Sequence, residues 1–243
     1  MSGHSKWNNI KRKKEKTDAA KAKIFTKIGR EIAVIVKTGG ANPNENSKLK
    51  DAIAKAKAAN VPNDNIERII KKAAGDTEAN NYEELIYEGY GPNGIAVVVE
   101  TLTDNRNRTA GEMRHYFDKC GGNLGQSGSV MFMFDRKGII EIEAEGKDED
   151  TVMEAALEAG AEDFSFDGDV FEIVTEPNDL GAVRDALEEK GYEFLLAEVQ
   201  YVPQTMTALD DEESITKMEK LIDMLEENDD VQNIWHNWDM PEE

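Results

Sequence analysis

The first residues of this chain that could do chemistry form a cationic segment near its amino end. One tryptophan, Trp7, stands within a run of lysine and arginine side chains that comprises Lys6, Lys11, Arg12, Lys13, Lys14 and Lys16. Lysine and arginine neutralise phosphates, and an indole ring offers a face on which a nucleobase can stack. The segment therefore predicts nucleic-acid binding. Its alternatives are unselective polyanion binding and a solvated tail whose Trp7 docks on the first helix.

The charge of the chain is divided unevenly along its length. The 243 residues carry a net charge of −21. Residues 1–75 hold 18 basic and 7 acidic side chains, a net charge of +11, so the remaining residues carry −32. A strongly positive segment on an acidic molecule is a candidate polyanion-binding module. We expect the acidic remainder to repel phosphate, so that nucleic acid contacts one end only.

A second group of cations lies on one face of a helix that is predicted to begin near Asp18. At 100° per residue, Lys23, Lys27 and Arg30 fall on one side, and the apolar residues between 24 and 36 fall on the other. Few acidic residues offset this row. We expect the helix to bury its apolar side and to present its cations to phosphate; a purely solubilising face is the alternative.

Arg106 and Arg108 lie where a strand is predicted to give way to a helix. The Asp and Asn at positions 104 and 105 can cap that helix. The first turn of a helix prefers anionic side chains, so two arginines there need another explanation. Both could bind phosphate, or acidic neighbours such as Glu100 and Glu112, with the same forked geometry.

The segment 121–129 is rich in glycine. It lacks the lysine and the spacing of a phosphate-binding loop, and it precedes a predicted strand instead of a helix. We interpret it as a flexible turn whose backbone donors could approach a nucleic-acid backbone.

The sequence offers little for catalysis. Its three histidines (His4, His115 and His236) have no metal-ligand spacing with the single cysteine, Cys120. No nucleophile elbow or zinc-protease motif occurs, and the acidic clusters at 141–150, 210–213 and 226–230 resemble solvated faces. We predict a non-enzymatic protein without cofactor, metal or small-molecule substrate. A hydrolase or transferase would need a pocket of convergent titratable groups, which we expect to be absent.

Periodicity predicts the secondary structure. Spacings of 3.6 residues and helix-ending glycines predict helices near 18–39, 47–60, 63–75, 106–119, 149–159, 179–190 and 211–227. Alternation predicts strands near 82–90, 95–103, 129–134, 139–144, 164–166, 170–174, 192–202 and 231–235. The segment Gly91-Pro92-Asn93-Gly94 joins the first two strands as a hairpin turn.

These elements indicate an α+β protein of three domains. Residues 1–75 form a basic helical domain. The order β-α-β-β-α-β over residues 136–204 is that of a ferredoxin-like α/β domain. The acidic helix and short strand that follow could not fold alone, so we expect residues 76–135 and 205–243 to form one α/β domain into which the ferredoxin-like domain is inserted.

The overall composition predicts a cytoplasmic protein. One cysteine excludes an internal disulfide framework and suits a reducing compartment. No apolar run approaches the ~20 residues of a membrane span, and the amino end resembles neither a secretory signal nor a transit peptide. The sequence does not indicate an oligomeric state.

Several motifs together resemble the YebC family. They are Gly3-His4-Ser5-Lys6-Trp7, Lys23-Ile24-Phe25-Thr26-Lys27, Tyr87-Glu88-Gly89-Tyr90-Gly91-Pro92, Asp104-Asn105-Arg106-Asn107-Arg108-Thr109, Lys119-Cys120-Gly121-Gly122-Asn123-Leu124 and Asp230-Val231-Gln232 with His236-Asn237. The resemblance implies an N-terminal helical domain and two α/β domains around a cleft. Its bacterial members are usually labelled probable transcriptional regulators, and a mitochondrial relative is a translational activator of a cytochrome oxidase subunit. This chain departs from the family chiefly in its acidity, with Trp235 and Trp238 where similar chains often have Tyr and Phe.

The sequence and the resemblance together predict a nucleic-acid-binding regulator of gene expression. The family implies promoter DNA as the partner, or ribosomal RNA with action on translation at difficult messages. Residues 47–60 show lysine and alanine but few side chains suited to base edges, so we expect recognition of backbone or shape. An adaptor whose acidic domains bind a basic partner, such as ribosomal proteins, is the alternative of another class.

Overall fold

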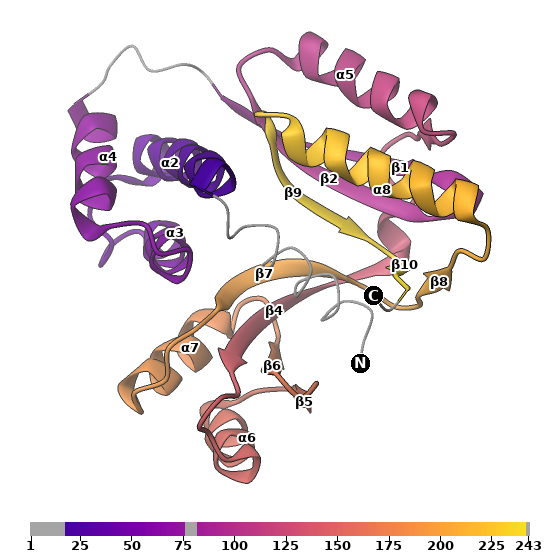
Figure 1. The fold of residues 1–243 in the computed structure, drawn as a ribbon. Helices are drawn as coiled ribbons and strands as arrows, with labels where there is room; N and C mark the ends of the chain where they lie inside the picture. The colour runs from indigo at the N-terminus through magenta and orange to yellow at the C-terminus, as the bar shows by residue number, and fades with distance from the viewer. Residues whose placement is uncertain (1–17, 76–81, 242–243) are drawn as a thin grey trace. The chain divides into compact units, whose positions relative to one another are not determined.

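The computed structural model of the protein describes residues 18–75 and 82–241 (Figure 1). Within them, residues 18–75 and 136–200 form one compact unit, and residues 82–135 and 201–241 form a second. The predicted N-terminal segment with Trp7 lies outside the described residues.

The first unit begins with three helices. α2 (Asp18–Gly39), α3 (Ser47–Ala58) and α4 (Asn63–Gly75) pack around a core of Ile, Leu, Val and Ala side chains, with Ile32 and Leu49 fully buried. Asn46 caps α3, because its side-chain oxygen accepts the backbone N–H of Leu49 at 3.2 Å. Gly40, at φ +87°, ends α2 in the left-handed conformation that favours glycine. These bounds agree with the predicted helices.

The same unit continues as a ferredoxin-like domain. In chain order it contains β4 (Phe134–Glu143), α6 (Glu149–Ala159), β5 (Asp163–Phe166), β6 (Val170–Thr175), α7 (Leu180–Glu189) and β7 (Leu196–Pro203). The sheet order is β5-β6-β4-β7. Both helices pack on one face of the sheet, over inward side chains such as Ile140, Phe171 and Ile173. The order β-α-β-β-α-β is therefore confirmed.

Ion pairs connect the helical and ferredoxin-like parts of this unit. Arg184 of α7 is almost completely buried, and its guanidinium contacts Asp51 of α3 at 2.7 Å and Asp185 at 3.0 Å. Lys55 of α3 contacts Glu198 of β7 at 3.1 Å. Burying a guanidinium is costly unless carboxylates accept its hydrogens, so Arg184 requires α3 and α7 to stay together.

The second unit is a four-stranded antiparallel sheet with the order β3-β1-β2-β9. The strands are β1 (Glu83–Tyr90), β2 (Ala96–Thr103), β3 (Asn123–Leu124) and β9 (Val231–His236). A short turn, η1 (Pro92–Gly94), closes the β1–β2 hairpin. α5 (Arg106–Lys119) and α8 (Glu212–Glu227) lie along one face of this sheet in Figure 1, over a core that includes Phe117 and Trp238. The pairing of β9 with β2 returns the end of the chain to the sheet that β1 begins.

The structure confirms the α+β class with a helical domain and two α/β domains, and it corrects five details. The strand predicted over 139–144 is part of the longer β4, which begins at Phe134, and the two-residue strand β3 was not predicted. Residues 131–133 form a short 3₁₀ helix, η2 (Met131–Met133), where a strand over 129–134 was predicted. The last ferredoxin-like strand begins at Leu196 instead of residue 192. A two-stranded parallel sheet of β8 (Thr207–Ala208) and β10 (Trp238–Asp239) was not predicted. The domain limits 1–75, 76–135 plus 205–243 and 136–204 stay a prediction.

Replacing Arg184 tests the connection within the first unit. Arg184→Met keeps an unbranched apolar stem and removes both ion pairs, so we expect the free energy of unfolding to fall by about 1–3 kcal/mol. Urea denaturation followed by circular dichroism measures it. Lys190→Met is the control, because the ion pair of Lys190 with Glu158 is exposed to solvent. Equal losses in the two variants would contradict a special role for the buried guanidinium.

Candidate nucleic-acid interface

Seven of the predicted nucleic-acid-binding residues have no described geometry. Lys6, Trp7, Lys11, Arg12, Lys13, Lys14 and Lys16 lie outside the described residues. Their role stays a prediction from the sequence.

The predicted cationic row of α2 is less exposed than the helical wheel suggests. Lys23, Lys27 and Arg30 are each half-buried. Each also has a hydrogen bond or electrostatic interaction with another group. A role in phosphate binding for these three cations stays a prediction.

The structure instead finds exposed lysines that the prediction did not include. On α2, α3 and α4 the exposed lysines without an ion pair among the described residues are Lys21, Lys48, Lys57, Lys71 and Lys72. Sequence periodicity could have found Lys48, Lys57, Lys71 and Lys72, which fall away from the apolar faces of α3 and α4; Lys21 falls within the apolar arc of α2, so periodicity would not have found it. Two other lysines of α3 form ion pairs within the protein: Lys50 contacts Asp185, and Lys55 contacts Glu198. The helical domain therefore divides its lysines between internal ion pairs and solvent.

The two predicted arginines of α5 have different surroundings. Asn105 is the N-cap, and its side-chain oxygen accepts the backbone N–H of Arg108 at 3.1 Å. The Arg108 guanidinium donates to Asp104 at 3.0 Å and to Asp230 at 2.7 Å. Arg106 is exposed and makes no ion pair with any residue in the described part of the chain. Arg106 is thus available to a phosphate, whereas the guanidinium of Arg108 is already bound to two carboxylates of the protein.

The two glutamates that the sequence suggested as partners of these arginines bind asparagine side chains instead. Glu100 accepts a hydrogen bond from the Asn233 side chain at 2.6 Å. Glu112 accepts one from the Asn228 side chain at 2.7 Å. The actual partner of Arg108 is Asp230, from the cluster 226–230 that was interpreted as a solvated face. That interpretation is wrong for Asp230, which is buried at the end of α8 where the chain enters β9.

Asp230 is the centre of a hydrogen-bond network. Its carboxylate accepts the Thr109 hydroxyl at 2.9 Å and the Thr103 hydroxyl at 3.1 Å, in addition to Arg108. Burial alone would raise the pKa of Asp230, but the hydrogen bonds from Arg108, Thr109 and Thr103 outweigh it and hold the pKa below its ordinary value. The network joins β2, α5 and β9, and it fixes the start of α5 that carries Arg106.

A second buried carboxylate holds the glycine-rich segment in place. Glu88 of β1 accepts the backbone N–H of Gly128 at 2.6 Å, of Met131 at 2.8 Å and of Val130 at 2.9 Å. Those N–H groups are therefore not available to a strand ladder, which explains the 3₁₀ turn over 131–133. The interpretation of 121–129 as a flexible turn is corrected, because Glu88 binds its end.

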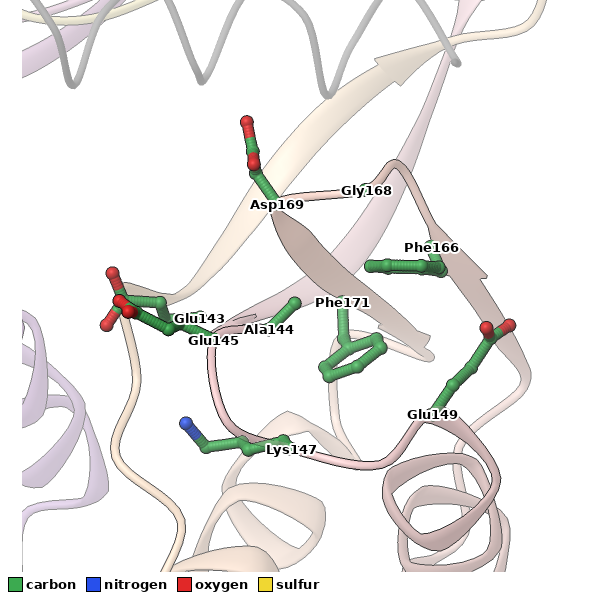
Figure 2. Close-up of a pocket in the computed structure, with 9 residues that line it drawn as sticks. All are labelled: Glu143, Ala144, Glu145, Lys147, Glu149, Phe166, Gly168, Asp169 and Phe171. Carbon is green, nitrogen blue, oxygen red and sulfur yellow. The ribbon is translucent and has the colours of Figure 1, made fainter.

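The ferredoxin-like domain contains a hollow of about 480 Å³ (Figure 2). Carboxylates surround two phenylalanine rings, with one lysine, in the set Glu143, Ala144, Glu145, Lys147, Glu149, Phe166, Gly168, Asp169 and Phe171. The carboxylates stand around the rim in Figure 2 and point away from one another, so the expectation that no pocket of convergent titratable groups exists stays a prediction. The lining contains no Ser, Thr, Cys or His that could act as a nucleophile. With four carboxylates to one lysine, the hollow repels phosphate and attracts cations.

Other chemistry is limited in the described part of the chain. Within residues 18–75 and 82–241, no three His, Cys, Asp or Glu side chains are arranged to hold a metal ion. None of the helices there is both long and apolar enough to cross a membrane. Cys120 is buried in the core of the second unit, and burial raises the pKa of its thiol.

The pKa of Asp230 predicts a pH dependence of stability. A carboxylate whose pKa is lowered by folding stabilises the protein above the ordinary Asp pKa, and this contribution is lost as the pH falls through the folded value. We expect Asp230→Asn to lower the free energy of unfolding by about 1–3 kcal/mol at pH 7, and the difference from the wild type to shrink below about pH 4. Urea titrations at pH 7 and pH 3 measure it. Asp239→Asn, at an exposed position, is the control; a constant difference for Asp230→Asn at both pH values would contradict the network.

Comparison with known proteins identifies the family. The description "TACO1/YebC protein N-terminal domain" matches residues 5–76, and "TACO1/YebC second and third domain" matches residues 82–238. Two relatives are each named "probable transcriptional regulatory protein". The one from Acetivibrio thermocellus is 64% identical over 239 residues, which is 98% of this chain and 99% of the relative. The one from Ruminiclostridium cellulolyticum is 61% identical over 244 residues, which is 100% of this chain and 98% of the relative.

A solved structure shows the same fold. The crystal structure of a conserved hypothetical protein from Aquifex aeolicus superposes with a TM-score of 0.83 at 47% sequence identity, and the match covers 93% of each chain. With both domain descriptions matched along nearly the whole sequence, the chain belongs to the TACO1/YebC family.

Proposed function

We propose that this protein is a non-enzymatic, cytoplasmic, nucleic-acid-binding regulator of gene expression whose main contact is the helical segment 1–75. The observation that carries the proposal is the charge division, +11 on that segment against −32 on the rest. The relatives named as probable transcriptional regulatory proteins support a regulatory role. A phosphate backbone is the partner that such a charge division selects.

The exposed side chains of the helical segment favour contacts to the backbone over readout of bases. Most of the described exposed cations are lysines, which bind phosphate as point charges; the exception is Arg68, whose guanidinium donates to the Asn65 side chain at 2.8 Å. Base edges in the major groove are usually read by Arg, Asn or Gln in forked geometry, and α3 presents lysine and alanine instead. Duplex DNA and structured ribosomal RNA both fit this mode of recognition, so the proposal includes regulation of transcription, with regulation of translation at the ribosome as its alternative.

The acidic hollow supports a second candidate, a protein-interaction adaptor. Phe166 is an exposed apolar side chain that lines the hollow together with Glu143, Glu149 and Asp169. A lysine- or arginine-rich segment of a partner, such as a ribosomal protein, is the complement of that surface. Under this candidate the partner would bind to residues 136–204, and residues 1–75 would have no affinity for nucleic acid.

Reversing charge in the N-terminal segment tests the main proposal. We expect the variant with Lys11, Arg12, Lys13 and Lys14 all changed to Glu to bind labelled duplex DNA and structured RNA more weakly. The slope of log K against log salt concentration should decrease in magnitude by about 2.8 to 3.6 if all four side chains contact phosphate, since each lost phosphate contact removes about 0.7–0.9. Fluorescence anisotropy between 50 and 200 mM salt measures it.

A matched variant controls for net charge. Arg114, Lys119, Lys147 and Lys220 are exposed cations outside residues 1–75, and their change to Glu alters the net charge by the same amount. An equal loss of binding in both variants would contradict a local contact. Sedimentation of cell lysate then separates the alternatives: migration with ribosomes selects translation, and enrichment on specific DNA fragments without ribosomes selects transcription.

A further inference from the structure

One large apolar side chain of the second unit projects into solvent. Phe132, in the middle of η2, is 70% exposed, the largest exposure among the large apolar side chains of the described residues. Its neighbours Met131 and Met133 are half-buried and pack against the cluster that contains Val130 and Phe134. The exposed apolar surface here is therefore a single ring and not a patch.

The ring has a fixed support. The carboxylate of Glu88 is buried and binds the N–H groups of Val130 and Met131, immediately before Phe132. The Tyr90 hydroxyl donates to the carbonyl oxygen of Ser129 at 3.0 Å. After the turn, the N–H of Gln204 donates to the carbonyl of Met133 at 2.9 Å. Hydrogen bonds on both sides of Phe132 hold the turn, so the exposure of its ring is part of the fold.

The segment that carries the ring contains no charged residue; the exposed Asp135 follows it directly, and its carboxylate accepts a hydrogen bond from the Gln204 side chain at 3.0 Å. Residues 120–134 are an uncharged run of 15 residues, in a chain of which 33% is charged. Glu88 lies beneath this run, and its carboxylate is turned to the backbone N–H groups. Polar neutral side chains, Gln126 and Ser127, are exposed nearby in the chain. On an otherwise acidic unit, a polyanion could approach this segment without meeting a side-chain carboxylate of the segment itself.

A single ring among neutral polar groups favours a nucleobase as the partner. A stable protein interface buries on the order of 1,000 Å² around an apolar core, which one ring does not provide. A base needs only one aromatic face, and the stack tolerates any sequence. Neutral amide and hydroxyl groups such as those of Gln126 and Ser127 can hydrogen-bond to base edges.

We propose that Phe132 is a stacking platform for an unpaired base of single-stranded nucleic acid, distinct from the cationic helical segment. The inference rests on the proposed function, in which that segment binds the phosphates of the same molecule. The helical segment would supply salt-dependent affinity, and Phe132 would supply a preference for unstacked bases over a duplex.

Substitution of Phe132 tests the proposal with the full chain. The probe is a fluorescein-labelled 16-nucleotide RNA without self-complementarity, and the same strand annealed to its complement. We expect Phe132→Ala to bind the single strand about 5- to 150-fold more weakly, the range for loss of one stacked base. Duplex affinity and the salt slope should not change, because no phosphate contact is removed. Phe132→Trp should retain binding, and Phe132→Leu, which is apolar without a ring, should not.

Ile86→Ala is the matched control, since Ile86 is another exposed apolar residue of the same unit. A strand with 2-aminopurine at one position gives a direct readout, because stacking quenches its fluorescence, and the quench should disappear in Phe132→Ala. Unchanged single-strand binding by Phe132→Ala would overturn the stacking platform, and so would wild-type single-strand affinity in Phe132→Leu. Either result would leave the proposed function intact. If the charge-reversed N-terminal variant binds as tightly as the wild type, the proposed function fails; absence of wild-type binding to both probes overturns both.

Discussion

A buried carboxylate needs hydrogen-bond donors, and this requirement organises the second unit. Leaving an ionised carboxylate in an apolar interior without donors costs several kcal/mol. Asp230 receives two threonine hydroxyls and the Arg108 guanidinium, and Glu88 receives three backbone N–H groups. The first carboxylate fixes the junction of β2, α5 and β9, and the second fixes the turn before β4. The two segments that could meet a partner in this unit, the start of α5 and η2, are thus both positioned by acidic residues.

The same requirement limits which cations of the first unit can meet nucleic acid. Arg184 and Lys55 neutralise carboxylates between α3 and the ferredoxin-like domain, while Lys48 and Lys57 of the same helix remain exposed. At physiological ionic strength the Debye length is about 8 Å, so an exposed lysine interacts mainly with charges in its own vicinity. A net charge of −21 is therefore compatible with phosphate binding, provided that the positive side chains are gathered on one segment.

Local sequence patterns predicted most helices and strands. The candidate site was predicted less well, because it depends on contacts between residues that are distant in the sequence. α5 begins and ends at the predicted residues, because its capping Asn105 and its apolar spacing are local signals. The partner of Arg108 is 122 residues away in the sequence, so proximity along the chain suggested Glu100 and Glu112 instead. Likewise, nothing in the segment 129–134 itself reveals that Glu88, 42 residues before Val130 and 43 before Met131, accepts their N–H groups. The family resemblance fixed the fold class, and it did not supply these contacts.

Glycine content was the most misleading of the local signals. A glycine-rich segment usually indicates a mobile turn, but here the glycines permit close packing. A Cβ on Gly122 would overlap the Tyr90 carbonyl oxygen, and one on Gly125 would overlap the Ser129 hydroxyl. Composition cannot distinguish a glycine that gives freedom from one that allows backbones to approach. Since a partner that binds an ordered loop does not have to order it, the close packing of 121–129 reduces the entropic cost of any contact that the adjacent Phe132 makes.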